Sequence, residues 1–435
     1  MAALLPVRRT IFRSRRFSGL ASTTLRRAIV AALVTAGVVA AQTRAASGRA
    51  LQKLTPHVVR LANGKSFSLD LPADFEIDVA AEGLHRVRFL ARAPDGRILT
   101  TDMHDRSDNS LGVVYILDGF DAATGRFARV IPYLQHLRNP NDVAFYTDHD
   151  GQSWLYLPLT DKLERFRYKA GDIAPTGPPE ILATYPDYGL NYKYGGWHLT
   201  RTVVMGSDHR RDTLFVSVGS SCNNCEEKEP IRATISAMDP DGKNARVIAR
   251  GMRNAVGLRF VGNTLYATNM GGDHLGDEAP DDPMFALDLA GSEPNNYGWP
   301  YCYFQHGKVV PDPMFAGSPK KVDCGVAPST YAVFAAHSAP LGLEYFDRAA
   351  DPALGGSFLV ALHGASKVSL GTGYRVVRVA AGKHGGLPED FLTGFLRRGV
   401  VYGRPCGILR VGPDAFLLTD DEAGVVYYVH HATPK

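Results

Sequence analysis

Hydrophobic and polar positions alternate in short runs along most of this chain, and the runs recur in six similar segments. Each segment has a pivot of small or charged residues, a hydrophobic run of strand length, a polar turn and a second hydrophobic run. The segments begin at Leu84, Pro140, Gly196, Ala255, Pro340 and Pro405, so their spacings are 56, 56, 59, 85 and 65 residues. Repeats near this period with Gly/Asp turns are typical of propellers, whose units bury their apolar faces only by stacking. The pattern predicts an all-β fold, a six-bladed β-propeller of four-stranded antiparallel blades over residues 68–435.

Two parts of the chain depart from the regular spacing. The interval of 85 residues predicts an insertion at about 270–337, rich in Gly, Asp and Pro and containing aromatic residues and two cysteines. Long loops of this kind are commonly functional, so we expect it to be ordered and to lie on the binding face. The polar leader at 42–67 is expected to donate a strand that closes the last blade.

The N-terminus has the pattern of a secretory signal peptide over residues 1–41. Arginines precede an apolar run of 14 residues, Ala28–Ala41, that ends in small residues. This run is shorter than the roughly 20 residues that span a bilayer. The pairs Arg15-Arg16 and Arg26-Arg27 suggest the twin-arginine route, and an uncleaved anchor is the alternative. The folded part is therefore expected to be periplasmic or secreted, without stable membrane insertion.

Composition excludes some partners. The net charge of +4 arises largely from arginines in the N-terminal segment, so it gives no reason to expect a nucleic-acid partner. The five cysteines fit an oxidising compartment, where Cys222–Cys225 and Cys302–Cys324 are the expected disulfides and Cys406 is left over. A zinc site would need a second pair of ligands at metal-binding spacing, and the neighbouring sequence has none.

The pivots carry the residues most suited to chemistry. Because propeller pivots converge on the central channel, their polar groups are candidate ligands. They are Arg138, Asn139, His198, Arg253, Asn254, His337 and Arg404. Several guanidinium groups beside one imidazole suit a multiply anionic ligand next to a proton acceptor. The alternative is that these groups only bind channel water and neighbouring turns.

Four motifs together resemble the glucose/sorbosone dehydrogenase family. They are GGWHLTRTVVMGSD with SVGSSCNNC, GMRNAVGLRF, EPNNYGWP and HGASKVSLGTGYRVVRV. The resemblance covers about residues 75–429 and is closer to the sorbosone dehydrogenase branch than to soluble glucose dehydrogenase. It implies a soluble, periplasmic six-bladed propeller that uses pyrroloquinoline quinone (PQQ) and calcium.

The resemblance also implies roles for individual residues. His198 would be the general base that removes a proton from the substrate hydroxyl while hydride passes to the quinone. Arg253 would stabilise negative charge on the quinone oxygen, and Asn254 would bind the cofactor beside it. Gly272 and Asp273 are the closest matches to the calcium site, where oxygen donors hold a Lewis-acidic cation. An ordinary solvated acidic loop is the alternative for these last two residues.

Two positions depart from the family pattern. Where glucose-oxidising members have two arginines one residue apart, this chain has Arg404 and Cys406. The lysine expected near the fifth blade is replaced around His363, with Lys367 as the nearest substitute. Both changes remove positive charge, so we expect weaker binding of PQQ than in members with two arginines.

The leading hypothesis is a quinoprotein dehydrogenase that oxidises an aldose or a sugar aldehyde such as a sorbosone. It would pass electrons to an acceptor such as a quinone or a cytochrome. The alternatives are a calcium-dependent sugar lactonase or other hydrolase, and a non-enzymatic propeller that binds a ligand. The arginine-rich pivots favour the first hypothesis over the lactonase, whose metal is usually held by several acidic or amide side chains.

Overall fold

The computed structural model describes residues 53–187, 198–208, 210–291, 293–320, 322–348 and 352–432. The expected signal peptide at 1–41 lies outside these residues. Nearly all regular structure in these residues is β-strand, apart from three single-turn 3-10 helices: η1 (Pro313–Phe315), η2 (Cys324–Val326) and η3 (Val368–Leu370). Within the described residues, no helix is long and apolar enough to cross a membrane.

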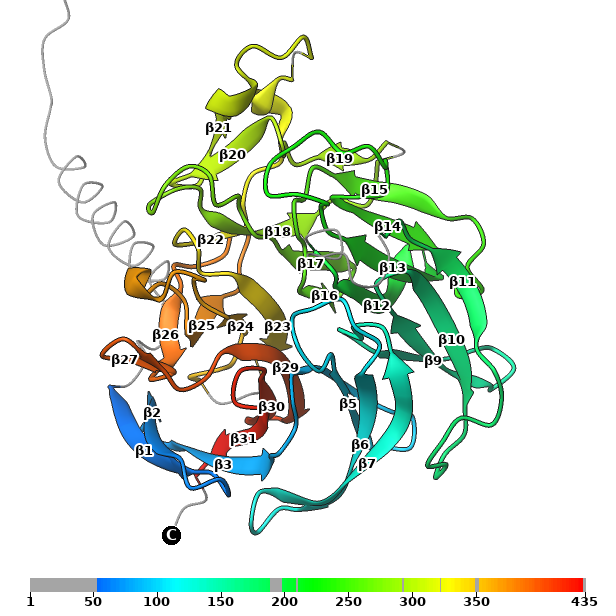
Figure 1. Ribbon diagram of the computed structural model, residues 1–435, viewed down its shortest axis with the longest axis vertical. Coiled ribbons are helices and arrows are strands. Elements are labelled where there is room, and N and C mark those ends of the chain that lie inside the picture. The colour runs from blue at the N-terminus through cyan, green and yellow to red at the C-terminus, as the bar shows by residue number, and fades with distance from the viewer. Residues whose placement is uncertain are drawn as a thin grey trace, which may run out of the picture. The chain divides into compact units, whose positions relative to one another are not determined.

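Six sheets surround a common axis and confirm the predicted propeller (Figure 1). Blade 1 consists of β4 (Val87–Arg92), β5 (Ile98–Asp102), β6 (Gly112–Asp121) and β7 (Arg126–Leu137). Blade 2 consists of β8 (Ala144–Thr147), β9 (Ser153–Pro158), β10 (Lys162–Tyr168) and β11 (Glu180–Thr184). Blade 3 consists of β12 (Arg201–Asp208), β13 (Arg211–Val218), β14 (Thr234–Met238) and β15 (Arg246–Arg250), with the short β19 (Asn295–Asn296) parallel to β15.

The other three blades follow the same antiparallel order. Blade 4 consists of β16 (Leu258–Val261), β17 (Thr264–Thr268), β18 (Asp282–Leu287) and β22 (Ala332–Phe334). Blade 5 consists of β23 (Pro340–Phe346), β24 (Ser357–Leu362), β25 (Arg375–Ala380) and β26 (Glu389–Leu392). Blade 6 consists of β29 (Pro405–Gly412), β30 (Ala415–Asp420), β31 (Val425–His431) and β3 (Phe75–Ala81).

The first strand of each blade is its inner strand, and these strands contact one another in sequence around the ring. The contacts run from β4 through β8, β12, β16, β23 and β29 back to β4. Buried apolar side chains fill the spaces between neighbouring sheets in several clusters, as expected when each sheet covers the next. The turns that lead into the inner strands therefore meet at one end of the ring.

Hydroxyl groups and glycines let the inner strands approach closely. Thr268 accepts the N–H of Gly257 in its own blade and donates to the carbonyl of Leu341 in the next, at 2.9 and 2.8 Å. Thr419 makes the same pair of bonds with Gly407 and the carbonyl of Arg88. A Cβ on Gly257 would lie only 2.1 Å from the carbonyl oxygen of Leu341. The glycine that follows a pivot is therefore needed for the packing of one blade on the next.

Two expectations about the chain's organisation need correction. The closing strand comes from Phe75–Ala81, which pairs with β31, and not from the leader at 42–67. The leader region instead enters a separate hairpin of β1 (Leu54–Arg60) and β2 (Ser66–Pro72). The predicted insertion also includes β18, a strand of blade 4, because Pro283 in its DPMFAL run hid the strand pattern.

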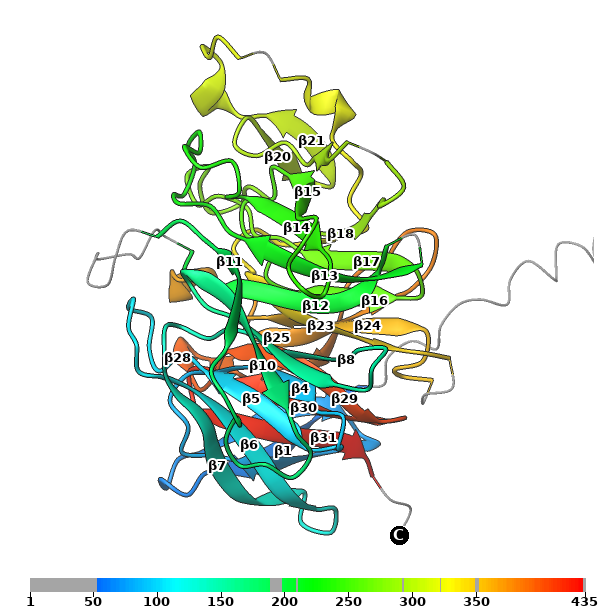
Figure 2. The same ribbon diagram turned by 90° about the vertical axis from the view of Figure 1, so that its right-hand side faces the viewer.

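Two further hairpins lie outside the six blades. β20 (Cys302–Gln305) pairs with β21 (Lys308–Pro311), and β27 (Leu396–Arg397) pairs with β28 (Val400–Val401). Figure 2, turned by 90°, shows β20 and β21 projecting beyond the blade 3 and blade 4 strands. Residues between β18 and β22 thus form an ordered excursion from blade 4, fastened by the Cys302–Cys324 disulfide.

Candidate functional site

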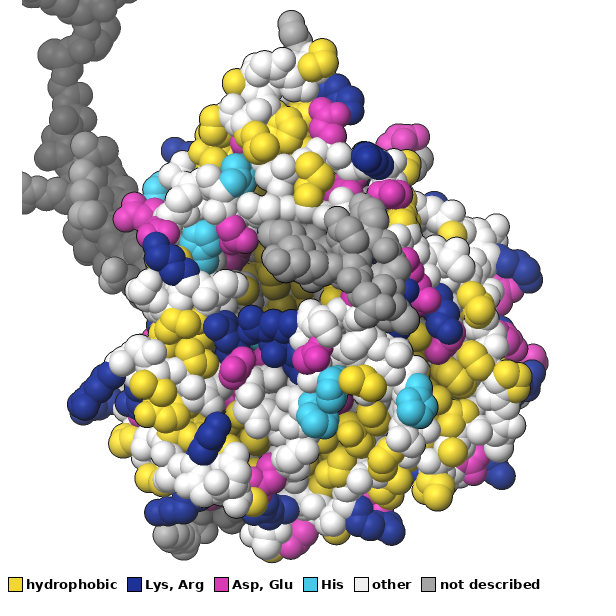
Figure 3. All heavy atoms as spheres, viewed as in Figure 1, with side chains coloured by type: hydrophobic (Ala, Val, Ile, Leu, Met, Phe, Trp, Pro, Cys, Tyr) yellow, Lys and Arg dark blue, Asp and Glu magenta, His cyan; other side chains and the backbone are white. Residues whose placement is uncertain are grey.

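The candidate site lies at the end of the ring where the pivots meet. Figure 3 shows a hollow in the middle of this face, bordered by a row of Lys and Arg side chains. His198 and Arg253 belong to the pivots that precede β12 and β16, and both contact Ser220 in the loop after β13. Gly219 separates His198 from Asn254, since a Cβ at Gly219 would lie within 2.7 Å of both side chains. The structure therefore brings His198, Arg253 and Asn254 together, and their roles stay predictions.

The hydrogen bonds of His198 fix which ring nitrogen carries the proton. Ser220 Oγ donates to the carbonyl of Cys222 at 2.6 Å, because a carbonyl can only accept. The same Oγ lies 2.9 Å from His198 Nδ1, and the Ser220 carbonyl lies 3.0 Å from it. Both oxygens thus accept from Nδ1–H, which leaves Nε2 as the acceptor nitrogen of the neutral ring.

The surroundings of His198 keep its ring neutral. Desolvation by the surrounding protein lowers the pKa of His198 well below its usual 6.5, and the positive charges of Arg253, Arg201 and Arg232 lower it further. The bond to the Ser220 carbonyl raises the pKa, with a smaller effect than burial or Arg253. A neutral imidazole with a defined acceptor nitrogen is the state that a general base requires.

Arg253 is buried and its guanidinium is oriented by the protein. Its Nε donates to the backbone carbonyl of Asn223 and its Nη2 donates to Asn223 Oδ1, both at 2.8 Å. Asp273 Oδ2 lies 3.7 Å from Nη2 and offsets part of the charge. Burial lowers the pKa of Arg253, although the guanidinium stays protonated at neutral pH. The group is a fixed positive charge beside His198.

The 271–273 loop fits a hard cation. The N–H groups of Gly271 and Asp273 donate to Asp282 and Asn223, at 2.7 and 2.9 Å. The carbonyl oxygens of Gly271 and Gly272 accept no hydrogen bond from any residue that the structure describes. With the largely exposed carboxylate of Asp273, they supply oxygen donors of the type that calcium prefers. His337 Nδ1 lies 3.1 Å from this carboxylate.

A cationic cluster joins His363, which the sequence analysis named at the expected lysine position, to three residues that it missed. Its members are Arg86, Arg88, His363 and Asp421. Asp421 is fully buried and accepts from Arg88 Nη1 at 2.5 Å and from His363 Nε2 at 2.7 Å, and Arg86 Nη2 lies 3.1 Å away. Although burial alone would raise the pKa of Asp421, His363 and the two arginines lower it below its usual range. Burial lowers the pKa of His363 to about 4, so this ring is a neutral donor.

The structure shows the surroundings of Arg404, Cys406 and Lys367, the residues at the two departures from the family pattern. Arg404 is buried, donates to the carbonyl of Gly364 at 2.8 Å and stacks over the ring of Tyr374, so it organises the turn at 363–365. Lys367 lies on the exposed rim and pairs with Asp277. Arg86 and Arg88 lie near Cys406, where their charges lower the pKa of the thiol while burial and Asp421 raise it. The sequence could have revealed Arg88, because the repeat register aligns it with Cys406.

Cys406 itself belongs to an apolar cluster at the axis. The thiol has no exposed surface and packs with Val256 and Leu341, while Phe89 and Met270 cover the cluster. Burial raises the pKa of the thiol to about 12. The two expected disulfides are confirmed, which leaves Cys406 as the free cysteine.

We expect Cys406 to resist chemical modification in the folded protein, because a buried neutral thiol is a poor nucleophile. Ellman's reagent should detect no thiol in the native chain and one thiol per chain in denaturant without reductant. Rapid reaction of one thiol in the native protein would contradict the burial of Cys406.

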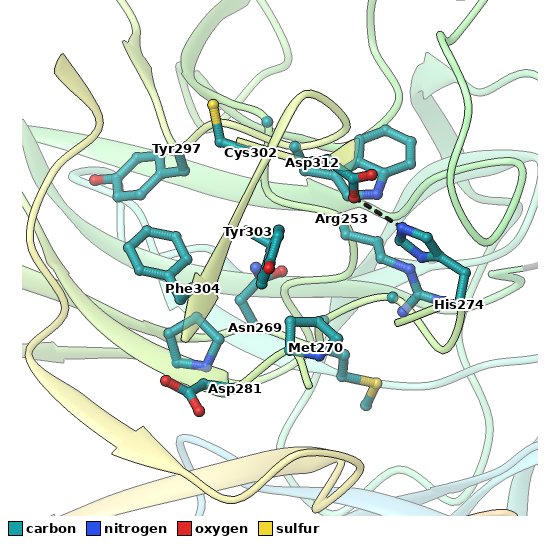
Figure 4. A pocket seen from close by; sticks show the side chains of 16 residues that line it. Arg253, Asn269, Met270, His274, Asp281, Tyr297, Cys302, Tyr303, Phe304 and Asp312 are labelled. Carbon is teal, nitrogen blue, oxygen red and sulfur yellow. Dashed lines mark hydrogen bonds and ion pairs between the residues drawn. The ribbon is translucent and has the colours of Figure 1, made fainter. Parts of the chain in front are cut away.

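A small cavity is lined in part by Arg253. Met270, Tyr303 and Asp312 contribute to its lining (Figure 4). His274 Nε2 lies 2.7 Å from Asp312 Oδ2, the interaction drawn as a dashed line, and Asn224 Nδ2 contacts both groups. The excursion from blade 4 thus reaches the back of the candidate site.

Comparisons with known proteins agree with this architecture. A family model described as TrAA12-like matches residues 69–394, whereas no curated protein matches the sequence. The PQQ domain of pyranose dehydrogenase from Coprinopsis cinerea is 18% identical, with a TM-score of 0.65 over 86% of this chain and 98% of that chain. An AA12 protein of Trichoderma reesei, with a structure described as the calcium structure, is 16% identical, with a TM-score of 0.67 over 89% and 100%. The soluble aldose sugar dehydrogenase of Escherichia coli is 14% identical, with a TM-score of 0.52 over 82% and 99%.

Proposed function

The chain belongs to the TrAA12-like family, and from that premise we propose that it is a sugar oxidoreductase that uses PQQ together with calcium. The observation that carries the proposal is the pair of His198, with Nε2 as its acceptor nitrogen, and the fixed guanidinium of Arg253. Two structural relatives are described as a PQQ domain and as a calcium structure, which supports the same cofactors here. The substrate class that we propose is an aldose or a sugar aldehyde such as a sorbosone.

Different residues around the hollow at the pivot end of the ring would bind different parts of the cofactor. Bound PQQ would supply an electron-poor quinone that accepts a hydride. Arg86 and Arg88 would attract its carboxylates, since charge-assisted bonds to guanidinium groups are among the strongest available. Asn254 would bind beside Arg253, while Gly272 and Asp273 would hold calcium through oxygen atoms. Arg404 and His363 would support the opposite wall, and Lys367 is a weaker candidate because Asp277 already binds it.

The protein's own contribution to the reaction is proton transfer and electrostatic stabilisation. His198 Nε2 would accept the proton of the substrate hydroxyl as the C–H bond breaks. Arg253 would stabilise the negative charge that develops on the acceptor oxygen, because its two bonds to Asn223 hold the charge in place before the reaction. Its burial strengthens this effect by excluding water.

We also propose that the protein functions outside the cytoplasm, in the periplasm or secreted, and passes electrons to a quinone or a cytochrome. Two disulfides support an oxidising compartment. The N-terminal pattern of arginines followed by a short apolar run supports export.

Titration of the purified chain with PQQ in calcium buffer tests the proposed function. Saturable changes in the PQQ absorption spectrum and reduction of a redox dye by aldoses are expected, and a chelator should remove both. The protein without PQQ serves as the control. If PQQ does not bind even in excess, the proposal is wrong; hydrolysis of a sugar lactone with calcium alone would support the lactonase instead.

A further inference from the structure

We infer that the loop closed by the Cys222–Cys225 disulfide is the positioning element for both His198 and Arg253, with Asn223 as its main positioning residue. The inference rests on the proposed function and adds a specific origin for the geometry of the site. The loop lies between β13, which ends at Val218, and β14, which begins at Thr234. No strand pairing fixes this segment, so its shape depends on other restraints.

The first contact runs from the loop to His198. The carbonyl of Cys222 accepts the Ser220 hydroxyl at 2.6 Å, which turns the lone pairs of Oγ toward His198 Nδ1. If this carbonyl moved, the hydroxyl could rotate and donate to Nδ1 instead. Nε2 would then carry the proton and could no longer accept one from a substrate. The Ser220 carbonyl, 3.0 Å from Nδ1, favours the same tautomer, so the position of Cys222 reinforces it through the hydroxyl.

The second contact runs from the loop to Arg253. Asn223 accepts Nε through its backbone carbonyl and Nη2 through its side chain, and two such bonds fix the plane of a guanidinium group. Asn223 Oδ1 also accepts the N–H of Asp273 at 2.9 Å. Asn223 Oδ1 thus links the guanidinium of Arg253 to the 271–273 loop, whose oxygen atoms could hold a cation.

The restraints on the loop are the disulfide and one carboxylate. The disulfide joins residues three positions apart, with a Cα–Cα distance of 6.1 Å. Glu227 accepts the N–H and the hydroxyl of Ser221, at 2.6 and 2.7 Å, on the other side of the loop. The side chain of Asn224 contacts His274 and Asp312. Within this loop, adjacent asparagines therefore have different partners.

Asn223→Ala and Asn224→Ala form a matched pair of variants. We expect Asn223→Ala to lower kcat by about 10- to 100-fold, since a small misorientation of a catalytic group has an effect of this size. The affinity for PQQ should also fall, as measured by absorption titration, because Asp273 loses its anchor. Asn224→Ala makes the same chemical change in the same loop. The fold loss of kcat in this variant should be at least five times smaller than in Asn223→Ala. Equal losses of kcat in two variants of similar melting temperature would overturn the inference.

The disulfide itself is tested with Cys222→Ser/Cys225→Ser, and Cys302→Ser/Cys324→Ser is the control for loss of a disulfide. In the cofactor-free protein, NMR titration should show the pKa of His198 rising toward 6.5 in the first variant, because a loosened loop admits water to the ring. The acidic limb of the kcat/KM profile should move to higher pH with it. The control should shift both by less, because its disulfide fastens the excursion from blade 4 and does not close the 222–225 loop. An unshifted His198 pKa in a folded Cys222→Ser/Cys225→Ser protein would contradict the inference.

The wild-type protein separates failure of this inference from failure of the proposed function. If wild type neither binds PQQ nor oxidises sugars, the function is wrong, while the NMR titration still tests the positioning of His198. If wild type is active and Asn223→Ala behaves like wild type, the function stands and the inference is wrong.

Discussion

Replacement of His198 by alanine is expected to lower kcat by about 10²–10⁴-fold, the usual loss when a general base is removed. The affinity for PQQ should change little, because Arg86, Arg88 and Asn254 remain to bind it. The measurement is dye-linked turnover with a panel of aldoses, together with an absorption titration of PQQ. Retained cofactor affinity would distinguish loss of proton transfer from collapse of the site.

Added imidazole provides a control for His198→Ala. A small base that enters the vacated space should restore part of the lost turnover, and the restored rate should increase with imidazole concentration. His430→Ala, at a histidine of β31 that stacks on Tyr428, should keep normal turnover. A near-normal kcat of His198→Ala with every sugar tested would show that the histidine is only structural.

Asp421→Ala is expected to lower the free energy of unfolding by about 3–5 kcal/mol, the typical cost of removing one partner of a buried ion pair. Arg88 would lose its buried counter-ion, and His363 would lose its acceptor. Urea unfolding monitored by tryptophan fluorescence measures the change. Because the pKa of Asp421 is lowered by folding, its contribution is complete above the usual value of 3.8 and disappears only as the pH falls further.

Asp390→Ala is the matched control for Asp421→Ala. Asp390 pairs with Arg375 at 2.9 Å, yet their side chains are 42% and 37% exposed. Water screens such a pair, so its loss should change stability by less than about 1 kcal/mol. Similar losses in the two variants would mean that the Asp421 cluster is solvated in solution.

The repeat pattern predicted the fold because its signals have local physical causes. Gly257 and Gly407 each follow a pivot, and each allows the inner strand of the next blade to approach within hydrogen-bonding distance of a threonine. Because the same packing requirement recurs at successive blades, similar residues occupy the same position in each repeat. The sequence did not identify Phe75–Ala81 as the closing strand, because this strand pairs with residues more than 300 positions away and no local pattern specifies that partner.

The candidate site was predicted only in part. His198 and Arg253 were identified from motifs, and the two disulfides from spacing and compartment. Arg86, Arg88 and Asp421 were missed because their cluster with His363 joins blades 5, 6 and 1, which only the closed ring brings together. The orienting role of Asn223 was missed for a related reason, since its backbone carbonyl is as important as its side chain.

Closure of the ring by β3 has a consequence for the order of folding. The outer strand of blade 6 is β3, but the three strands that it joins, β29 to β31, are synthesised more than 300 residues after it. Until they emerge from the ribosome, β3 has no edge to pair with and the cluster around Asp421 lacks its central carboxylate. Contacts between such distant residues are slow to form, since a long loop must close first. The ring therefore stays open until β31 has been translated, and a chain that stopped before Val425 would lack the strand that pairs with β3.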